Sequence, residues 1–551
     1  MSYLSAFERP NLLQKLSSEK YDLVIIGGGI TGVGIALDAA SRGLKTALVE
    51  KYDFASGTSS RSTKLVHGGL RYLKQFEVAL VREVGRERAI VHELAPHLVI
   101  PEKMLLPIVE GGTFGKFLTS IGLMVYDVLA GVEKPDQREM LSKEETLEHE
   151  PLLEHAPLKG GGLYAEYRTD DARLTVEVMK TAARFGSDSI NYVEAIEFEY
   201  DAEGMVCGIA CKDELEGKEF SIKADYVVSA AGPWVDDLRK KNHSMNEKHL
   251  FLSKGVHIVV PHDKFPVQQS VYFDVPDGRM IFAIPRGKVT YIGTTDTEYK
   301  GDVDYIVANI EDVDYLLKAI AHTFPQIKLE ASDVVSSWAG VRPLIHEEGK
   351  SASEISRKDE VFESSTGLIS IAGGKLTGYR KMSEKVVDLV VKRRYKEDGT
   401  KVALCRTEHI DLRGGEALPN SKAVKKYTKK IYKKIEKGGL TKHDAWYLVS
   451  NYGTQSKAIV KRFFELRPMH LAPIALLKAE LWFTVHHEMV FSPLDFYMRR
   501  TGRFYFDIES VRSSKHIILE EFAKYFHWSE EKTWQEQAIL ETALKEAASF
   551  E

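Results

Sequence analysis

The sequence predicts an α/β fold that is built from three parts. A glycine-rich turn lies between two short apolar runs near the N-terminus, and a later apolar run leads into the paired glycines Gly373 and Gly374. Between these segments, β-rich runs alternate with turns, and beyond about residue 400 the chain turns helical and strongly charged. We therefore expect an α/β domain that is interrupted by a β-rich domain and followed by a helical domain.

The N-terminal glycines have the spacing of a dinucleotide-binding turn. The run from Asp22 to Ile26 predicts a strand, and Gly27, Gly29 and Gly32 follow it as G-x-G-x-x-G before an Ala-rich helix. In a Rossmann-type turn these glycines permit the bend, the close approach of a pyrophosphate and the packing of helix on strand. The next apolar run ends in Glu50, which we expect to bind an adenosine ribose. An ordinary glycine-rich turn is the alternative.

A hydroxyl-rich segment follows Glu50. NAD and FAD share an adenosine diphosphate half, so the glycines alone do not distinguish them. Residues 56–64, SGTSSRSTK, offer hydroxyls from Ser59 and Ser60 where a longer cofactor would continue past its pyrophosphate along a ribityl chain. A solvated polar loop is the competing interpretation.

Composition excludes several classes of protein. The formal net charge is −5, whereas a general nucleic-acid binder needs a clustered basic surface. The three cysteines make no even disulfide framework and no C-x-x-C pair, which favours a reducing compartment. We find no signal peptide and no stretch of 18 or more uncharged apolar residues. No metal-binding motif and no G-x-S-x-G nucleophile appears, so we expect neither a metal site nor a hydrolase.

Two further glycine sites and one arginine are candidate functional residues. A buried run ending at Ala230 leads into Gly232, and Gly374 precedes Lys375 at the start of a helix, where backbone amides favour negative charge. Arg342, in SWAGVRPLI, precedes a proline that fixes the backbone, so its guanidinium is suited to bidentate phosphate binding. A structural ion pair is the alternative for Arg342.

Three motifs together resemble one enzyme family. They are IGGGITGVGIALDAASRG (residues 26–43), KLVHGGLRYL (64–73) and GGKLTGYRK (373–381), and the likeness to the FAD-dependent glycerol-3-phosphate dehydrogenase family runs over nearly the whole chain. The resemblance implies FAD as cofactor and the oxidation of sn-glycerol 3-phosphate to dihydroxyacetone phosphate. It also implies electron transfer to membrane quinone by a cytoplasmic protein on the inner face of the cell membrane, with a homodimer as an option.

The same resemblance gives the expected domain ranges. Residues 1–80, 165–250 and 335–400 are predicted to form a Rossmann-type FAD-binding domain. Residues 81–164 and 251–334 are predicted to form the β-rich substrate-binding domain, and residues 401–551 the helical C-terminal cap. One helical segment, residues 114–131, is open to two interpretations, a buried core helix or an amphipathic helix inserted into a membrane surface.

The resemblance also assigns a phosphate site. It implies that Arg342, Arg357 and Lys375 surround the substrate phosphate, with Arg71 and Tyr72 beside them, and that Arg342 and Lys375 count among the catalytic residues. Arg357 lies in the polar segment EISRKDE, which on its own predicts a surface charge.

Two histidines compete for the role of general base. His257 lies in the apolar strand GVHIVV, so we expect a fixed imidazole with a pKa near neutrality, or else a buried histidine satisfied by hydrogen bonds. His67 is followed by glycines that permit close cofactor approach. The resemblance favours His257 as the catalytic base and His67 as a flavin contact, and the sequence leaves the choice open.

The sequence is also compatible with two other functions. A glycerol-3-phosphate oxidase that uses oxygen is the nearest alternative, although we see no extra insertion of the kind that oxidases often carry. A flavin-dependent RNA-modifying protein is more distant and would use the lysine-rich segment 422–437. On a helix, Val424, Tyr427, Ile431 and Ile435 would line one side of this segment, so a surface helix packed on the core is the simpler interpretation.

Overall fold

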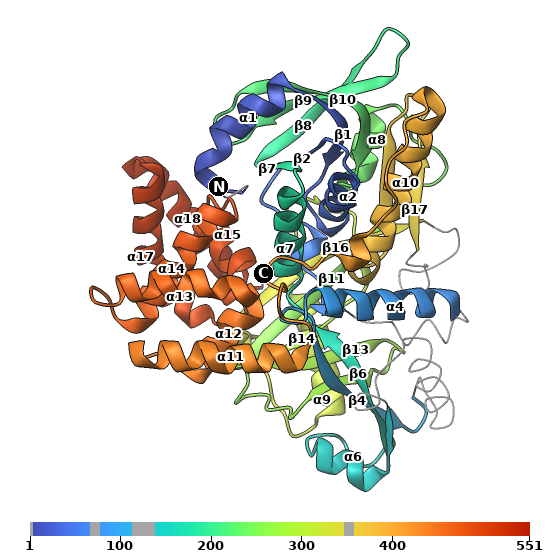
Figure 1. Cartoon of the computed structure of the whole chain (residues 1–551). Coiled ribbons are helices and arrows are strands. Elements are labelled where there is room, and N and C mark those ends of the chain that lie inside the picture. The colour runs from blue at the N-terminus through green and yellow to red at the C-terminus, as the bar shows by residue number, and fades with distance from the viewer. Residues whose placement is uncertain (1–3, 67–77, 113–137, 347–357, 551) are drawn as a thin grey trace.

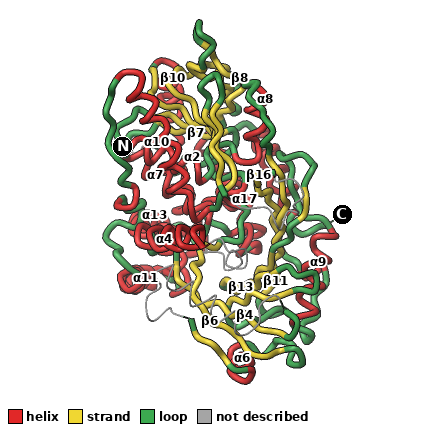
Figure 2. Tube along the Cα trace, turned by 90° about the vertical axis from the view of Figure 1, so that its right-hand side faces the viewer, coloured by secondary structure: helices red, strands yellow, loops and turns green. Residues whose placement is uncertain are grey.

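The computed structural model describes residues 4–66, 78–112, 138–346 and 358–550 of the 551-residue chain. Figure 1 shows two sheets, one above the other, and a group of helices from the C-terminal part of the chain beside them. This arrangement confirms the α/β class, the Rossmann-type domain and the helical C-terminal region. The tube in Figure 2, seen from the side, also separates the strands into an upper and a lower group.

The first sheet is mainly parallel. Its main path has the order β17 (Asp359–Glu363), β18 (Ile369–Gly373), β10 (Glu219–Ser229), β1 (Lys20–Ile26), β2 (Thr46–Glu50) and β7 (Asp188–Asn191). Only β17 is antiparallel to its neighbour on this path, and the antiparallel strands β8 (Val193–Tyr200) and β9 (Val206–Asp213) extend from β10. Leu23, Val24 and Ile25 of β1 are fully buried, as expected for a central parallel strand covered on both faces.

Three helices pack side by side on the first sheet. They are α7 (Asp171–Arg184), α2 (Ile30–Ser41) and α10 (Tyr379–Asp398), with α2 in the middle. The short helix α8 (Val235–Lys241) follows β10, and α1 (Arg9–Ser18) precedes β1. The two cysteines Cys207 and Cys211 lie on β9 and are free thiols, which agrees with the absence of a disulfide framework.

The second sheet is mainly antiparallel. Its order is β15 (Thr297–Glu298), β11 (Leu250–Pro261), β14 (Val289–Gly293), β13 (Met280–Arg286), β12 (Ser270–Asp274), β4 (Ile100–Val109), β6 (Leu158–Arg168) and β3 (Leu65–Val66). In addition, β16 (Ser336–Ile345) pairs with β11 along its length, and β5 (Glu139–Leu141) pairs with β6. The predicted domain boundaries stay a prediction, but strand pairing assigns β16, which begins just after residue 335, to the second sheet rather than to the first.

The two faces of the second sheet pack on different partners because side chains alternate along a strand. Val256, Ile258 and Val260 of β11 pack in a core with helix α9 (Ile310–Thr323), whereas Val259 packs in a core with the C-terminal helices. The sheet is therefore enclosed between α9 and the C-terminal region. Within the described ranges, the remaining α-helices outside that region are α4 (Val78–Leu94) and α6 (Lys143–His149).

All the regular secondary structure described in the C-terminal region is helical. Its helices are α11 (Ser421–Ile435), α12 (Lys442–Tyr452), α13 (Ser456–Leu466), α14 (Ala472–His487), α15 (Pro493–Asp495), α16 (Arg503–Phe506), α17 (Ile508–Phe526) and α18 (Glu530–Glu546). In α11, Ile431 and Ile435 are buried while Val424 and Tyr427 are half-buried against the same core. The amphipathic helix predicted from segment 422–437 is confirmed.

A network of buried ion pairs ties the C-terminal region to the first sheet. Asp53, in the loop after β2, is fully buried and accepts hydrogen bonds from Arg499 at 2.8 Å and from both terminal nitrogens of Arg500 at 2.7 Å. Asn191 at the end of β7 donates a further bond to Asp53 at 2.9 Å. Burial alone would raise the pKa of Asp53, but the charges of the two arginines hold it below its ordinary value.

The second half of this network joins α7 to the segment after α14. Arg173 donates to the two carboxylate oxygens of Glu488 at 2.6 and 2.9 Å, and Lys180 donates to the same group at 2.8 Å. Arg500 closes the connection by donating to the Glu488 carbonyl at 2.9 Å. All of these side chains are buried, so each charge relies on its partners instead of water.

We predict that replacing Asp53 with alanine strongly destabilises the protein. The variant leaves Arg499 and Arg500 buried without this carboxylate, and removing one partner of a buried ion pair costs about 3–5 kcal/mol. We expect a midpoint of thermal unfolding several degrees below that of the parent, measured by calorimetry. Asp225→Ala is the matched control, because its partner Lys20 and Asp225 itself are 63% and 40% exposed and such pairs contribute about 0–1 kcal/mol. Equal midpoints for the two variants would contradict the role given to Asp53.

Candidate active site

The glycine turn between β1 and α2 forms a tight cradle. Gly27 has φ +113°, and a Cβ atom there would lie 2.6 Å from the Ala230 carbonyl oxygen. A Cβ atom on Gly32 would lie 1.9 Å from the Gly27 carbonyl oxygen, which is impossible without moving the backbone. Gly29 caps α2 without a side-chain hydrogen bond of its own, and Gly29, Ile30 and Thr31 at the start of the helix line a cavity that a ligand could occupy.

Glu50 lies at the carboxyl end of β2, beside this turn. One carboxylate oxygen accepts the Gly28 amide at 2.6 Å, and the other accepts the Tyr52 amide at 2.9 Å. Burial raises the pKa of Glu50, although these amides act in the opposite direction. Binding of a ribose by Glu50 stays a prediction, while the amide contacts show that the carboxylate also shapes the turn.

The hydroxyl-rich segment packs against the same turn. The Ser59 hydroxyl accepts the Ile30 amide at 2.9 Å and so joins the segment to the first residue of α2. Asp171 at the start of α7 fixes the segment on the side of this helix. Its carboxylate accepts hydrogen bonds from the Lys64 ammonium at 2.6 Å and from the Ser62 hydroxyl at 2.6 Å. Ser60 is fully buried and is not one of the residues that line the adjoining cavity. Its predicted contact with the cofactor is therefore not supported by its position.

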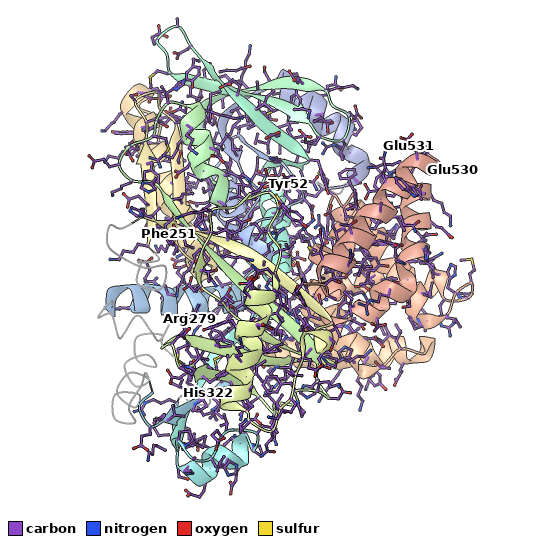
Figure 3. All side chains as sticks on the ribbon, turned by 180° about the vertical axis from the view of Figure 1, so that it is seen from behind. Tyr52, Phe251, Arg279, His322, Glu530 and Glu531 are labelled. Carbon is purple, nitrogen blue, oxygen red and sulfur yellow. The ribbon has the colours of Figure 1, made fainter. Side chains whose placement is uncertain are left out.

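A cavity of about 870 Å³ extends from this turn toward the second sheet. Tyr52 and Arg279, labelled in Figure 3, line it from the first and the second sheet respectively. Of the sequence candidates, the cavity is lined by Gly27, Gly29, Glu50, Ser59, Gly232, Arg342, Gly374 and Lys375. The volume lies in the upper part of the range of about 300–1,000 Å³ that small-molecule sites occupy.

Arg342 reaches the cavity from β16. Its guanidinium donates to the Thr294 hydroxyl at 3.0 Å and forms an ion pair with Asp296 at 3.3 Å. Gly255 on the paired strand makes room for it, because a Cβ atom there would lie 2.3 Å from Nη2. These contacts hold the guanidinium in place at the cavity wall.

Lys375 reaches the same cavity from the end of β18. Gly373 and Gly374 before it have φ +78° and +76°, a conformation that side chains disfavour, so the bend that directs Lys375 requires glycine. Two basic side chains from different sheets thus line one cavity with the dinucleotide turn.

His257 is buried behind the cavity wall instead of lining it. Its Nε2 lies 3.0 Å from the hydroxyl of Thr63, which does line the cavity, and its ring stacks on Trp338 at 4.8 Å between centroids. Burial, together with the positive charges of Arg342 and Lys64, holds the pKa of His257 well below its ordinary value. The predicted near-neutral pKa is therefore wrong for this histidine, since the strand pattern could not reveal the neighbouring cations.

The other expected site residues lie outside the described part of the chain. They are His67, Arg71, Tyr72 and Arg357, and the segment 114–131 is likewise outside it. Their predicted roles stay predictions.

The cavity contains residues that sequence reasoning missed. Arg61 lines it from inside the hydroxyl-rich segment and donates to the Ala339 carbonyl at 3.3 Å. Gly340 permits this approach, because a Cβ atom there would lie 2.6 Å from Arg61 Cβ. Tyr272 and Phe282, stacked at 4.1 Å, line the cavity from the second sheet. In the sequence, Tyr272 and Phe282 show only as aromatic residues within apolar, strand-like runs, which does not distinguish a cavity wall from a core.

The described residues fit a bound FAD. The glycine turn leaves space that a Cβ atom would fill, Ser59 and Thr58 follow beside it, and the cavity continues far enough to take more than an adenosine diphosphate. Among the described residues, no helix is long and apolar enough to cross a membrane.

Comparison with known proteins agrees with this fit. The family described as FAD dependent oxidoreductase matches residues 22–380, and the C-terminal domain of alpha-glycerophosphate oxidase matches residues 405–533. Aerobic glycerol-3-phosphate dehydrogenase from Bacillus subtilis (strain 168) is 51% identical over 547 residues, which are 98% of each chain. The protein of the same name from Staphylococcus aureus (strain USA300) is 49% identical over 546 residues, 99% of this chain and 98% of that relative.

Solved structures extend the comparison. The crystal structure of glycerol-3-phosphate dehydrogenase from Bacillus halodurans, complexed with FAD, has a TM-score of 0.85, is 44% identical and covers 99% of both chains. The L-alpha-glycerophosphate oxidase from Mycoplasma pneumoniae has a TM-score of 0.53 over 70% of this chain and 97% of its own, at 19% identity, which shows a shared fold alone. The chain therefore belongs to the FAD-dependent glycerol-3-phosphate dehydrogenase family.

Proposed function

We propose that this protein oxidises sn-glycerol 3-phosphate to dihydroxyacetone phosphate. The observation that carries the proposal is the presence of Arg342 and Lys375 in the same cavity as the dinucleotide turn. Such cations suit a small substrate that carries a phosphate, and the family's FAD would supply the hydride acceptor when it is bound. The relatives with 49–51% identity, which carry the name of this activity, support the same substrate.

The phosphate end of the substrate is assigned to Arg342 and Lys375. Arg342 presents a planar fork that matches two phosphate oxygens, and its bonds to Thr294 and Asp296 fix the orientation of that fork. Lys375 adds a point charge from the opposite sheet. We propose that Arg71, Tyr72 and Arg357 join this site, as the family resemblance implies.

We assign to His257 the role of accepting the proton of the substrate hydroxyl. Because its pKa is low, the imidazole is unprotonated at neutral pH and able to accept a proton. The Thr63 hydroxyl stands between Nε2 and the cavity, so we propose that the proton passes through this hydroxyl to His257. His67 is proposed to contact the flavin side of the site.

The electron acceptor is proposed to be membrane quinone, reached by peripheral contact of a cytoplasmic protein with the inner face of the membrane. Similarity over 98–99% of the chain to proteins named dehydrogenases supports this acceptor over oxygen, whereas the oxidase from Mycoplasma pneumoniae is far less similar. A homodimer is proposed as the assembly and is open to test by sedimentation.

We predict that Arg342→Ala lowers kcat/KM for glycerol 3-phosphate by about 10²-fold, because roughly 3 kcal/mol of charge-assisted binding is lost. FAD content should be unchanged, and activity on glycerol, which has no phosphate, should barely change in steady-state assays. Arg393→Ala is the control. Arg393 forms an ion pair with Glu363 at 2.6 Å, and neither of these residues lines the cavity. An equal loss on both substrates would make Arg342 a structural residue.

We predict that His257→Ala slows anaerobic reduction of the flavin by about 10² to 10⁴-fold in stopped-flow experiments, because the proton acceptor is removed. Thr63→Val should slow the same step while leaving the imidazole in place. Since the low pKa keeps His257 unprotonated, the parent rate should show no histidine ionisation between about pH 6.5 and 8. A normal rate in the His257→Ala protein would remove this histidine from the mechanism.

We predict that a water-soluble quinone analogue reoxidises the reduced protein at least about ten times faster than dissolved oxygen does, as expected for a dehydrogenase with a separate acceptor. The two reoxidation rates are measured after anaerobic reduction by glycerol 3-phosphate. Faster reoxidation by oxygen, with stoichiometric hydrogen peroxide, would identify an oxidase instead.

A further inference from the structure

A second cavity, of about 800 Å³, lies in the C-terminal helical region. Its walls come from the end of α11, from α13 and from the end of α14, which Figure 1 shows on the left of the molecule. No residue that lines it also lines the cavity of the dinucleotide turn. The second cavity is therefore separate from the site to which the proposed oxidation is assigned.

Five lysines surround this second cavity. Lys433, Lys434 and Lys437 come from the end of α11 and the turn after it, and Lys457 and Lys461 come from successive turns of α13. All five are exposed, and no carboxylate of the described residues forms an ion pair with them. So many like charges around one concavity produce a strong positive potential there.

Helix electrostatics explain only part of this cluster. Lys433 and Lys434 lie in the last turn of α11, where the helix dipole favours a cation. Lys457 is the second residue of α13, where the dipole opposes a cation and favours an anion instead. The position of Lys457 is therefore better explained by an anion in the cavity than by the stability of its own helix.

The other lining groups add little charge. Arg413 is neutralised by Glu416 at 2.8 Å. Burial, with the charge of Lys180, lowers the pKa of His487 to about 4, so this imidazole is neutral at physiological pH. The positive potential thus belongs to the five lysines.

The lining between the lysines is apolar. Phe483 is buried, Phe464 is 39% exposed, and Ala458 and Val460 lie near them on α13. An exposed aromatic ring beside phosphate-binding cations suits a ligand that combines charge with a flat or apolar group. The cavity volume matches a molecule of nucleotide size.

We propose that this second cavity binds a ligand that carries two or more phosphate charges next to an aromatic or apolar group. The lysines contact the phosphates as point charges, and Phe464 contacts the apolar group. Free nucleotides and anionic lipid headgroups share this chemistry, and separate arms of one experiment distinguish them.

The test uses the FAD-loaded protein, so that the adenosine site of the first cavity is filled. ATP, inorganic triphosphate and vesicles of phosphatidylglycerol with phosphatidylcholine are titrated separately by calorimetry. We expect saturable ATP binding that Lys457→Gln/Lys461→Gln weakens by at least about 10-fold, since two charged contacts are lost. Phe464→Ala should weaken the binding of ATP but leave the affinity for inorganic triphosphate within about twofold of the parent value.

Lys425→Gln/Lys429→Gln is the matched control, because it removes the same charge from exposed positions of α11 that do not line the cavity. Lys433→Gln/Lys434→Gln tests the opposite wall if the first pair changes the FAD content or the unfolding midpoint. A lipid headgroup would be the phosphate source if the parent protein binds the vesicles but not ATP, and if only the cavity variants lose this binding to vesicles. If no probe binds saturably, or if the cavity and control variants bind every probe equally, the proposal is overturned.

Discussion

The structure depends on a set of charges buried where three regions of the chain meet. Asp53 lies in the loop after β2, Arg499 and Arg500 lie in the C-terminal region, and Arg173 on α7 reaches the same place through Glu488. Removing such charges from water is costly, so each is stable only while its partners hold their positions. This requirement fixes the C-terminal helices against the first sheet more specifically than apolar contact alone would do.

Helix α7 connects this buried charge network to the active site. Its first residue, Asp171, holds Ser62 and Lys64 of the hydroxyl-rich segment, and the same helix presents Arg173 and Lys180 to the C-terminal region. The segment that lines the cofactor cavity is thus supported by a helix whose other contacts are buried ion pairs. A cavity wall supported in this way is preorganised for its ligand, because little ordering is needed when the ligand binds.

The cavity itself is a product of two sheets. The first sheet contributes the glycine turn and Lys375, and the second contributes Arg342, Tyr272 and Phe282. A parallel sheet with a helix start supplies backbone amides for a phosphate, whereas an antiparallel sheet supplies a wall of side chains. The pairing of β11 with β16 buries His257 and brings it onto a strand next to that of Arg342, and burial, together with this positive charge, lowers the pKa of the histidine.

The sequence by itself determined the local elements and the nature of the cofactor site. Glycine spacing between two apolar runs is a local signal, because the bend and the close approach of a pyrophosphate depend on consecutive residues, and it identified Gly27, Gly29, Gly32 and Glu50. Local context also indicated Arg342, which precedes a proline, and Lys375, which follows paired glycines at a helix start, and the family resemblance assigned both to the substrate phosphate. Only the tertiary structure decided that His257 contacts Thr63 without lining the cavity, that Ser60 is buried and does not line it, that Arg61 lines it, and that β16 pairs with β11. Each of these depends on strand pairing or on charges distant in sequence, and burial and pKa arise from such neighbours rather than from the residues beside a group in the chain.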